Sequence, residues 1–256
     1  MRYFLIGALA LAIAAPVAAA PQRQPATIVS ILVDLSQTWH NQESLTRNRR
    51  LLASVSKAIA DANAALPKPI LVSYRIIGEN SLTKDAFYIT RFAPSLLAKT
   101  DADSAASIGV FRQRLAGPRT GWTAAAGPVA YDPVPLTMLR LQPEQRTEIM
   151  GAVIAARRAD ALAASDAVRM MFVLSDFKED SRGAYKLTDS LKGYRIVLIG
   201  RVLGEDAKDA DALNKRTTAF KKALTARQAT VRIFEESAVL QSPADFAGLI
   251  DRLGRQ

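Results

Sequence analysis

A carboxylate and two hydroxyls follow the first apolar run of the chain at steps of two residues. Asp34, Ser36 and Thr38 come directly after the β-branched stretch 28–33. A run of this kind, bounded by polar turn residues, is typical of a strand that is buried on both faces. The three side chains would then leave the C-terminal end of the strand, where open α/β sheets bind ligands. An all-oxygen cluster suits a hard cation such as Mg²⁺, whereas the alternative is a simple turn in which Asp34 or Ser36 caps the next helix.

Strands and helices alternate along the rest of the chain, and this pattern predicts the fold class. We expect strands at 28–33, 70–77, 85–92, 169–175, 194–200 and 230–234, and helices at 43–66, 147–163, 207–227 and 243–253. The strand at 85–92 follows a short loop, so it should lie antiparallel at the sheet edge. The other connections contain helices and make βαβ units. The prediction is an α/β fold, three-layer α/β/α and Rossmann-like, with a mostly parallel sheet and one antiparallel edge strand.

Two further oxygen ligands should lie at the same edge of the sheet. Asp176 ends the apolar, and therefore central, strand 169–175, and Thr147 opens the helix that leads into it. In a parallel sheet, helix starts and strand C-termini share one edge. Three hydroxyls and two carboxylates would meet there and leave positions open for water or for a partner's oxygen. The predicted metal site consists of Asp34, Ser36, Thr38, Thr147 and Asp176.

These motifs, in this order, resemble the von Willebrand factor A-type (vWA) domains that carry a metal-ion-dependent adhesion site (MIDAS). Asp34-x-Ser36-x-Thr38 matches the Asp-x-Ser-x-Ser/Thr after the family's first strand, and Thr147 resembles the threonine that opens a later helix. The stretch 174–177, Leu-Ser-Asp-Phe, is similar to the family's apolar-Thr/Ser-Asp-Gly, with Phe177 in place of glycine. The resemblance spans Thr27 to about Phe234.

Two features depart from the family pattern. The stretch 143–146, Pro-Glu-Gln-Arg, stands where family loops often have glycines before the threonine, so Thr137 and Thr123 are the alternatives to Thr147. The segment 93–142 is longer than the usual connection and has little periodicity, apart from a helix expected at 104–115. Long irregular stretches are often functional. We therefore expect an insertion that determines partner specificity.

The resemblance implies a binding module and not an enzyme. In such domains the ion, Mg²⁺ or alternatively Mn²⁺ or Ca²⁺, is held chiefly through neutral hydroxyls, and a carboxylate of a protein partner completes its shell. Asp34 and Asp176 would orient hydroxyls and waters. The enzyme alternative is a magnesium-dependent phosphoester hydrolase with Asp34 as nucleophile. Such chemistry favours a second acid two residues later, where this chain has Ser36.

The first twenty residues have the plan of a secretory signal peptide. Arg2 precedes an apolar segment, 3–15, and small residues follow at 16–20. The prediction is a signal peptide at 1–20 and a single vWA-like domain at 26–256. The chain has no cysteine, so it is neither a disulfide scaffold nor a thiol enzyme. Export without disulfides fits a Gram-negative periplasm, so we expect a periplasmic or secreted protein.

The formal net charge is +10, and the basic residues are spread along the chain. Export argues against nucleic acid as the partner, which leaves an acidic protein or contact with an anionic membrane surface. The usual meaning of charge spread in this way is a solvated surface. His40 is the single histidine, too few for a catalytic triad or a zinc site, and a surface or capping role is expected. Trp39 and Trp122 are either contact aromatics or packing residues.

Overall fold

A computed structural model describes residues 27–41, 44–63, 70–92, 138–139, 141–161, 167–180, 188–201, 207–242, 245–246, 248 and 250. The predicted signal peptide, the helix expected at 104–115, and Trp122, Thr123 and Thr137 lie outside the described residues. The strands are β1 (Thr27–Asp34), β2 (Ile70–Ile77), β3 (Tyr88–Phe92), β4 (Val168–Ser175), β5 (Tyr194–Gly200) and β6 (Thr230–Glu235). The helices are α1 (Leu45–Asn63), α4 (Ile149–Asp160), α5 (Ala207–Thr225) and α6 (Glu236–Gln241).

The described strands form one sheet in the order β3-β2-β1-β4-β5-β6. Neighbouring strands from β2 to β6 run parallel, and β3 runs antiparallel to β2 at the end of the order. Val33 in β1 is level with Ile76 in β2 and with Leu174 in β4, so these three strands end side by side. The predicted α/β fold class is confirmed, and its central strand ends in Asp34.

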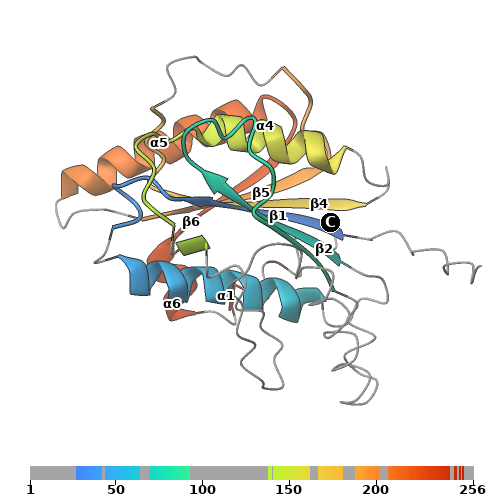
Figure 1. The fold of residues 1–256 in the computed structure, drawn as a ribbon, viewed down its shortest axis with the longest axis horizontal. Coiled ribbons are helices and arrows are strands. Elements are labelled where there is room, and N and C mark those ends of the chain that lie inside the picture. The colour runs from blue at the N-terminus through green and yellow to red at the C-terminus, as the bar shows by residue number, and fades with distance from the viewer. Residues whose placement is uncertain are drawn as a thin grey trace, which may run out of the picture.

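Helices cover both faces of the sheet, with α4 and α5 on one side and α1 and α6 on the other (Figure 1). Every residue of β1 is buried, as the sequence predicted for a strand between two layers. Its side chains alternate between the layers because successive residues of a strand point to opposite faces. Val29, Ile31 and Val33 join the core beneath α1 and α6, and Leu32 joins the core beneath α4 and α5.

The structure differs from the prediction in one missed helix and at the ends of elements. The pattern missed α6, because its six residues are too few for an amphipathic period to show. Of the closing helix expected at 243–253, the described residues Asp245, Phe246, Gly248 and Ile250 are helical. Helix α4 begins at Ile149, so Thr147 lies in the loop just before it rather than in its first turn.

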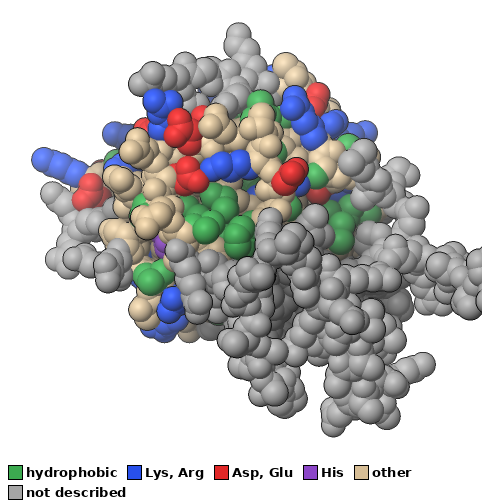
Figure 2. Space-filling model, viewed as in Figure 1, with side chains coloured by type: hydrophobic (Ala, Val, Ile, Leu, Met, Phe, Trp, Pro, Cys, Tyr) green, Lys and Arg blue, Asp and Glu red, His purple; other side chains and the backbone are tan. Residues whose placement is uncertain are grey.

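Surface charge is dispersed over the described face in Figure 2. Lysine and arginine side chains alternate with acids and apolar groups there, and form no continuous basic patch. This distribution fits the spread of basic residues along the sequence. Among the described helices, none combines the length and the apolar character that a bilayer-spanning segment needs.

Candidate metal centre

Three loops meet at the C-terminal ends of β1 and β4. The loop after β1 pairs with Glu144: the Gln37 N–H donates to the Glu144 carbonyl over 3.2 Å, and the Glu144 N–H donates to the Leu35 carbonyl over 2.7 Å. The loop after β4 is joined to the loop before α4, because the Asp180 N–H donates to the Thr147 carbonyl over 2.9 Å. Backbone bonds therefore hold together the three segments that carry the predicted ligands.

Asp34 is fully buried, and both of its carboxylate oxygens are hydrogen-bonded. Its Oδ1 accepts from the Ser36 N–H over 2.8 Å, and its Oδ2 accepts from the Ser175 hydroxyl over 2.6 Å. Burial raises the pKa of Asp34 to about 7, although the bonds from Ser175 and Ser36 act in the opposite direction. The negative charge of Asp176 raises the pKa further. The two acids are therefore close enough to interact.

The hydroxyls of Ser36 and Thr38 are paired at the mouth of the site. Ser36 Oγ lies 3.2 Å from Thr38 Oγ1; Ser36 is buried and Thr38 is exposed to solvent. In an octahedral Mg²⁺ shell with bonds near 2.1 Å, adjacent ligand oxygens are about 3 Å apart. The two hydroxyls therefore have the spacing of neighbouring ligands, and the exposure of Thr38 gives the site an opening.

Thr147 and Asp176 carry polar atoms that the fold leaves without partners. Both residues are 0% exposed, and neither Thr147 Oγ1 nor Asp176 Oδ2 has a hydrogen-bond partner in the described structure. The other oxygen of Asp176 accepts from the Lys178 N–H over 3.0 Å. An unsatisfied buried polar atom costs about 1–3 kcal/mol. Hydroxyl and carboxylate oxygens are the ligands of hard cations, so the donor set fits a divalent ion.

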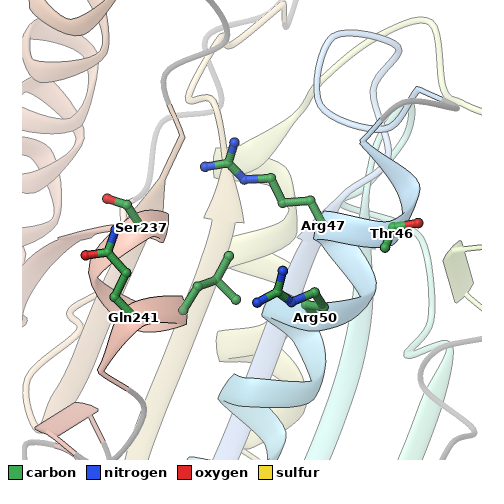
Figure 3. A pocket seen from close by; sticks show the side chains of 6 residues that line it. Thr46, Arg47, Arg50, Ser237 and Gln241 are labelled. Atoms are coloured by element: carbon green, nitrogen blue, oxygen red, sulfur yellow. The ribbon is translucent and has the colours of Figure 1, made fainter.

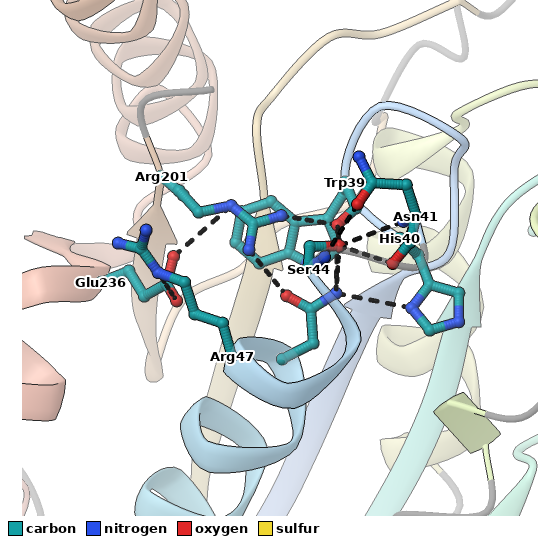
Figure 4. A network of polar contacts seen from close by, with 8 residues as sticks. Trp39, His40, Asn41, Ser44, Arg47, Arg201 and Glu236 are labelled. Carbon is teal, nitrogen blue, oxygen red and sulfur yellow. Dashed lines mark hydrogen bonds and ion pairs between the residues drawn. The ribbon is translucent and has the colours of Figure 1, made fainter. Parts of the chain in front are cut away.

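Neither carboxylate has a salt bridge within the described part of the chain. Arg201 interacts electrostatically with both. Its hydrogen bonds go elsewhere, to the Trp39 carbonyl over 2.6 Å and to Asn48 Oδ1 over 2.9 Å, and it forms a 3.5 Å ion pair with Glu236 (Figure 4). Two buried acids therefore share a region in which no described side chain neutralises them directly.

The predicted centre has too few acids to form a carboxylate cage. In the described residues no group of three or more His, Cys, Asp or Glu side chains is placed to hold a metal. The set of Asp34, Ser36, Thr38, Thr147 and Asp176 brings three hydroxyls and two carboxylates. Such a set would leave a bound ion with more positive charge than an all-carboxylate site would, and therefore receptive to a further anionic ligand.

Sequence reasoning missed three residues that position this site. Ser175 orients Asp34, and Arg216 on α5 donates from Nε to the Asp176 carbonyl over 2.9 Å. Glu179, in the loop after β4, caps α4. Its Oε2 accepts from the Ile149 and Met150 N–H groups over 2.9 and 3.2 Å. Acids are favoured beside helix N-termini, and this preference could have indicated the role of Glu179. It applies only once the loop after β4 is known to lie beside the start of α4.

Phe177 takes a backbone conformation that favours glycine. Its φ is +58°, in the left-handed region, where the resembling family has glycine. The ring is buried and packs against Phe220 of α5, with ring centres 5.6 Å apart. The Phe177 N–H donates to Ser175 Oγ over 2.9 Å. Burial of the ring and this bond hold the turn that presents Asp176.

Trp39 and His40 are interior residues. Trp39 is buried, and the Arg201 guanidinium lies 4.3 Å from the centre of its ring, so it packs rather than contacting a partner. His40 is also buried, with Nδ1 3.4 Å from Asn48 Nδ2 (Figure 4). Burial lowers the pKa of His40. Of the two roles expected for this histidine, surface or capping, the surface role is therefore wrong.

Comparisons with known proteins establish no family. No family model and no curated protein matches the chain. Proximal thread matrix protein 1 from the mussel byssus aligns at 13% identity and TM-score 0.40, over 91% of this chain and 49% of that one. The pilus adhesin SpaC of Lactobacillus rhamnosus GG aligns at 10% identity and TM-score 0.48, over 90% and 31%. Human COPII-coat protein Sec24c aligns at 12% identity and TM-score 0.40, over 90% and 32%. The chain thus spans half or less of these structures, and likenesses of this strength carry no argument about function.

Proposed function

We propose that this chain is a vWA-type binding module, exported to the periplasm, that contacts a protein partner through a divalent cation. The observation that carries the proposal is the pair of buried atoms without partners, Thr147 Oγ1 and Asp176 Oδ2, at the edge where Ser36 and Thr38 present their hydroxyls. Folding tolerates such atoms where a ligand satisfies them. Hydroxyls and carboxylates together indicate a hard divalent ion.

Each residue then has a distinct part. Ser36, Thr38 and Thr147 would offer hydroxyl oxygens, and Asp176 would offer its free Oδ2 directly or through water. Asp34 orients the loop, because it holds the Ser36 N–H and the Ser175 hydroxyl. A bound Mg²⁺ would supply an electrophilic position for a carboxylate of the partner. Thr38 is the exposed member of the set and marks the side from which the partner approaches.

The hydrolase alternative has less support. A nucleophilic carboxylate must reach its substrate, whereas Asp34 is fully buried and uses both oxygens in hydrogen bonds. Ser36 also occupies the position where this chemistry favours a second acid. Asp34 is better suited to holding the loop than to attacking a phosphorus atom.

Metal binding can be tested by thermal unfolding and Mn²⁺ titration. Millimolar Mg²⁺ or Mn²⁺ should raise the Tm of the wild type, and Asp34→Ala should remove the rise. An ion at a hundredfold excess over its Kd stabilises the native state by about 2.7 kcal/mol. Mn²⁺ titration followed by electron paramagnetic resonance reports binding without unfolding. A wild type that binds no Mn²⁺ at millimolar concentration would overturn the proposal.

Partner binding and hydrolysis need separate assays. Proteins captured by the wild type should be lost both in EDTA and with Asp34→Ala, whereas capture that survives EDTA would contradict a metal-mediated contact. The wild type should not hydrolyse a generic phosphate ester such as p-nitrophenyl phosphate. Hydrolysis by the wild type that disappears in Asp34→Ala would contradict the binding-module proposal and support the hydrolase alternative.

A further inference from the structure

A groove of about 460 Å³ lies between α1 and α6, on the face of the sheet that these helices cover. Its lining residues are Thr46, Arg47, Arg50, Ser237, Leu240 and Gln241. Figure 3 shows the side chains of Arg47 and Arg50 extending from α1 toward α6, where Ser237 and Gln241 stand opposite. Leu240 packs against the hydrophobic core beneath. No acidic side chain is among these lining residues.

The positive charge around this groove exceeds the negative charge. Glu236 is the buried carboxylate beside it and forms ion pairs with two arginines. Arg47 Nε lies 2.7 Å from its Oε1, and Arg201 Nε lies 3.5 Å from its Oε2. Arg50, also at the groove, forms no salt bridge within the described part of the chain. Two guanidinium groups, of Arg47 and Arg201, thus share one carboxylate, and Arg50 adds a third positive charge at the groove. The groove therefore attracts an anion.

The two lining arginines are arranged to hold that anion. The bond from Nε to Glu236 fixes the Arg47 side chain, which is still 49% exposed, and leaves its two terminal nitrogens as donors. Arg50 follows three residues later, on the same helical face, and none of its five N–H donors bonds to another residue in the described part of the chain. Thr46 and Gln241 add a hydroxyl and a side-chain amide at the rim. These groups are predominantly donors around one open volume.

We propose that this groove binds a phosphate monoester, clamped between Arg47 and Arg50, with its organic part against Leu240. One guanidinium fork already saturates the two oxygens of a carboxylate, whereas a phosphate offers three oxygens and a charge near −2 to two forks. The volume exceeds that of a phosphate and falls in the range of small-molecule sites, about 300–1,000 Å³. The monoester is either a soluble molecule or a phospholipid headgroup. The groove requires no cation and is independent of the proposed metal centre.

The test measures binding of glycerol 3-phosphate to the full chain by calorimetry in EDTA. We expect millimolar or tighter affinity for the wild type and at least a tenfold loss for Arg50→Gln. The matched control is Arg49→Gln, which removes the same charge from the neighbouring exposed position outside the groove and should change the Kd less than twofold. Arg50 is exposed, so its loss should leave the fold intact, which circular dichroism verifies.

A labelling experiment and a vesicle experiment complete the test. Glycerol 3-phosphate should protect Arg50 from phenylglyoxal, read by peptide mass spectrometry, and should leave Arg49 reactive. Vesicles that contain phosphatidic acid, compared with phosphatidylcholine alone, identify the source: Arg50-dependent binding to the first assigns a lipid headgroup, and binding of the soluble ester alone assigns a small molecule. Equal losses of affinity for Arg50→Gln and Arg49→Gln, or no protection of Arg50 from phenylglyoxal, would overturn the proposal that the groove binds a phosphate monoester.

Discussion

Two buried acids lie near opposite ends of helix α4, and their surroundings differ. Asp34 lies at the edge where α4 begins, and the neighbouring charge that raises its pKa is another acid, Asp176. Asp160 ends α4, and two arginines, Arg75 and Arg169, act to lower its pKa, while burial raises it to about 6. Both carboxylates are costly to bury. Two arginines act on Asp160, whereas Arg201, which interacts electrostatically with Asp34, directs its hydrogen bonds and its ion pair elsewhere.

This difference separates a structural acid from one that suits an outside cation. The Asp160 end contains a Ser30 hydroxyl that donates to Asp160 Oδ1 over 3.4 Å, and Ser30 Oγ lies 2.9 Å from Ser73 Oγ. Buried oxygens without described partners occur at both ends: Asp160 Oδ2 at one, Thr147 Oγ1 and Asp176 Oδ2 at the other. The Asp34 end combines them with a second acid, where the Asp160 end has two arginines. A divalent ion would offset the repulsion between the acids and satisfy those oxygens. The predictions below exploit the contrast, beginning with the largest effect.

Matched amide substitutions should separate the two acids most strongly. Asp34→Asn should weaken Mn²⁺ binding by about 10–100-fold, because Asp34 orients the loop that carries the hydroxyl ligands. Asp160→Asn makes the same chemical change at the other end of α4 and should leave the affinity within twofold. Electron paramagnetic resonance titration of Mn²⁺ measures both. Equal losses would mean that the two ends do not differ in the way proposed.

The stability of the metal-free protein should depend on pH through Asp160. Its folded pKa, about 6, lies above the ordinary value of 3.8, so the native state holds the proton more tightly than the unfolded chain does. The stabilising contribution of Asp160 to the free energy of unfolding is fully present below about pH 4 and is lost as the pH rises to about 6. Above that pH it no longer changes. One pKa unit corresponds to about 1.4 kcal/mol, and the rise from 3.8 to about 6 spans roughly two units, so the loss is about 3 kcal/mol.

Urea unfolding in EDTA at several pH values between 4 and 8 measures this effect. In the wild type the free energy of unfolding should fall as the pH rises. Asp160→Asn should remove the part of this fall between pH 4 and 6, whereas Asp34→Asn should remove a part that extends to about pH 7, the pKa of Asp34. A wild-type slope that both variants retain would show that neither carboxyl titrates in this range.

A smaller effect is expected at the helix cap. Glu179→Gln keeps a side-chain oxygen for the Ile149 and Met150 N–H groups but removes the charge at the N-terminus of α4. The free energy of unfolding should fall by about 0.5–1 kcal/mol. The Mg²⁺-dependent rise in Tm should remain, because Glu179 is outside the proposed ligand set. Loss of that rise would place Glu179 in the metal centre.

The sequence was most informative where burial on two faces dictates the pattern. The apolar runs at Ile70–Ile77 and Tyr194–Gly200 predicted two strands with the bounds that the structure has. Parallel topology then predicted the edge shared by Asp34 and Asp176. What escaped prediction depends on contacts between distant residues, such as Ser175 with Asp34 and Arg201 with Glu236. Spacing along a chain does not reveal such pairs.

The central claim is that the buried Thr147 hydroxyl is kept for a metal ion. Thr147→Val removes a hydroxyl without a partner, so it should raise the Tm of the metal-free protein and abolish the rise with Mg²⁺. Thr217→Val is the matched control, since the buried Thr217 hydroxyl already donates to the Leu213 carbonyl over 2.9 Å. That variant should gain no stability and should keep the Mg²⁺ effect. A Thr147→Val protein that responds to Mg²⁺ as the wild type does would contradict the metal centre.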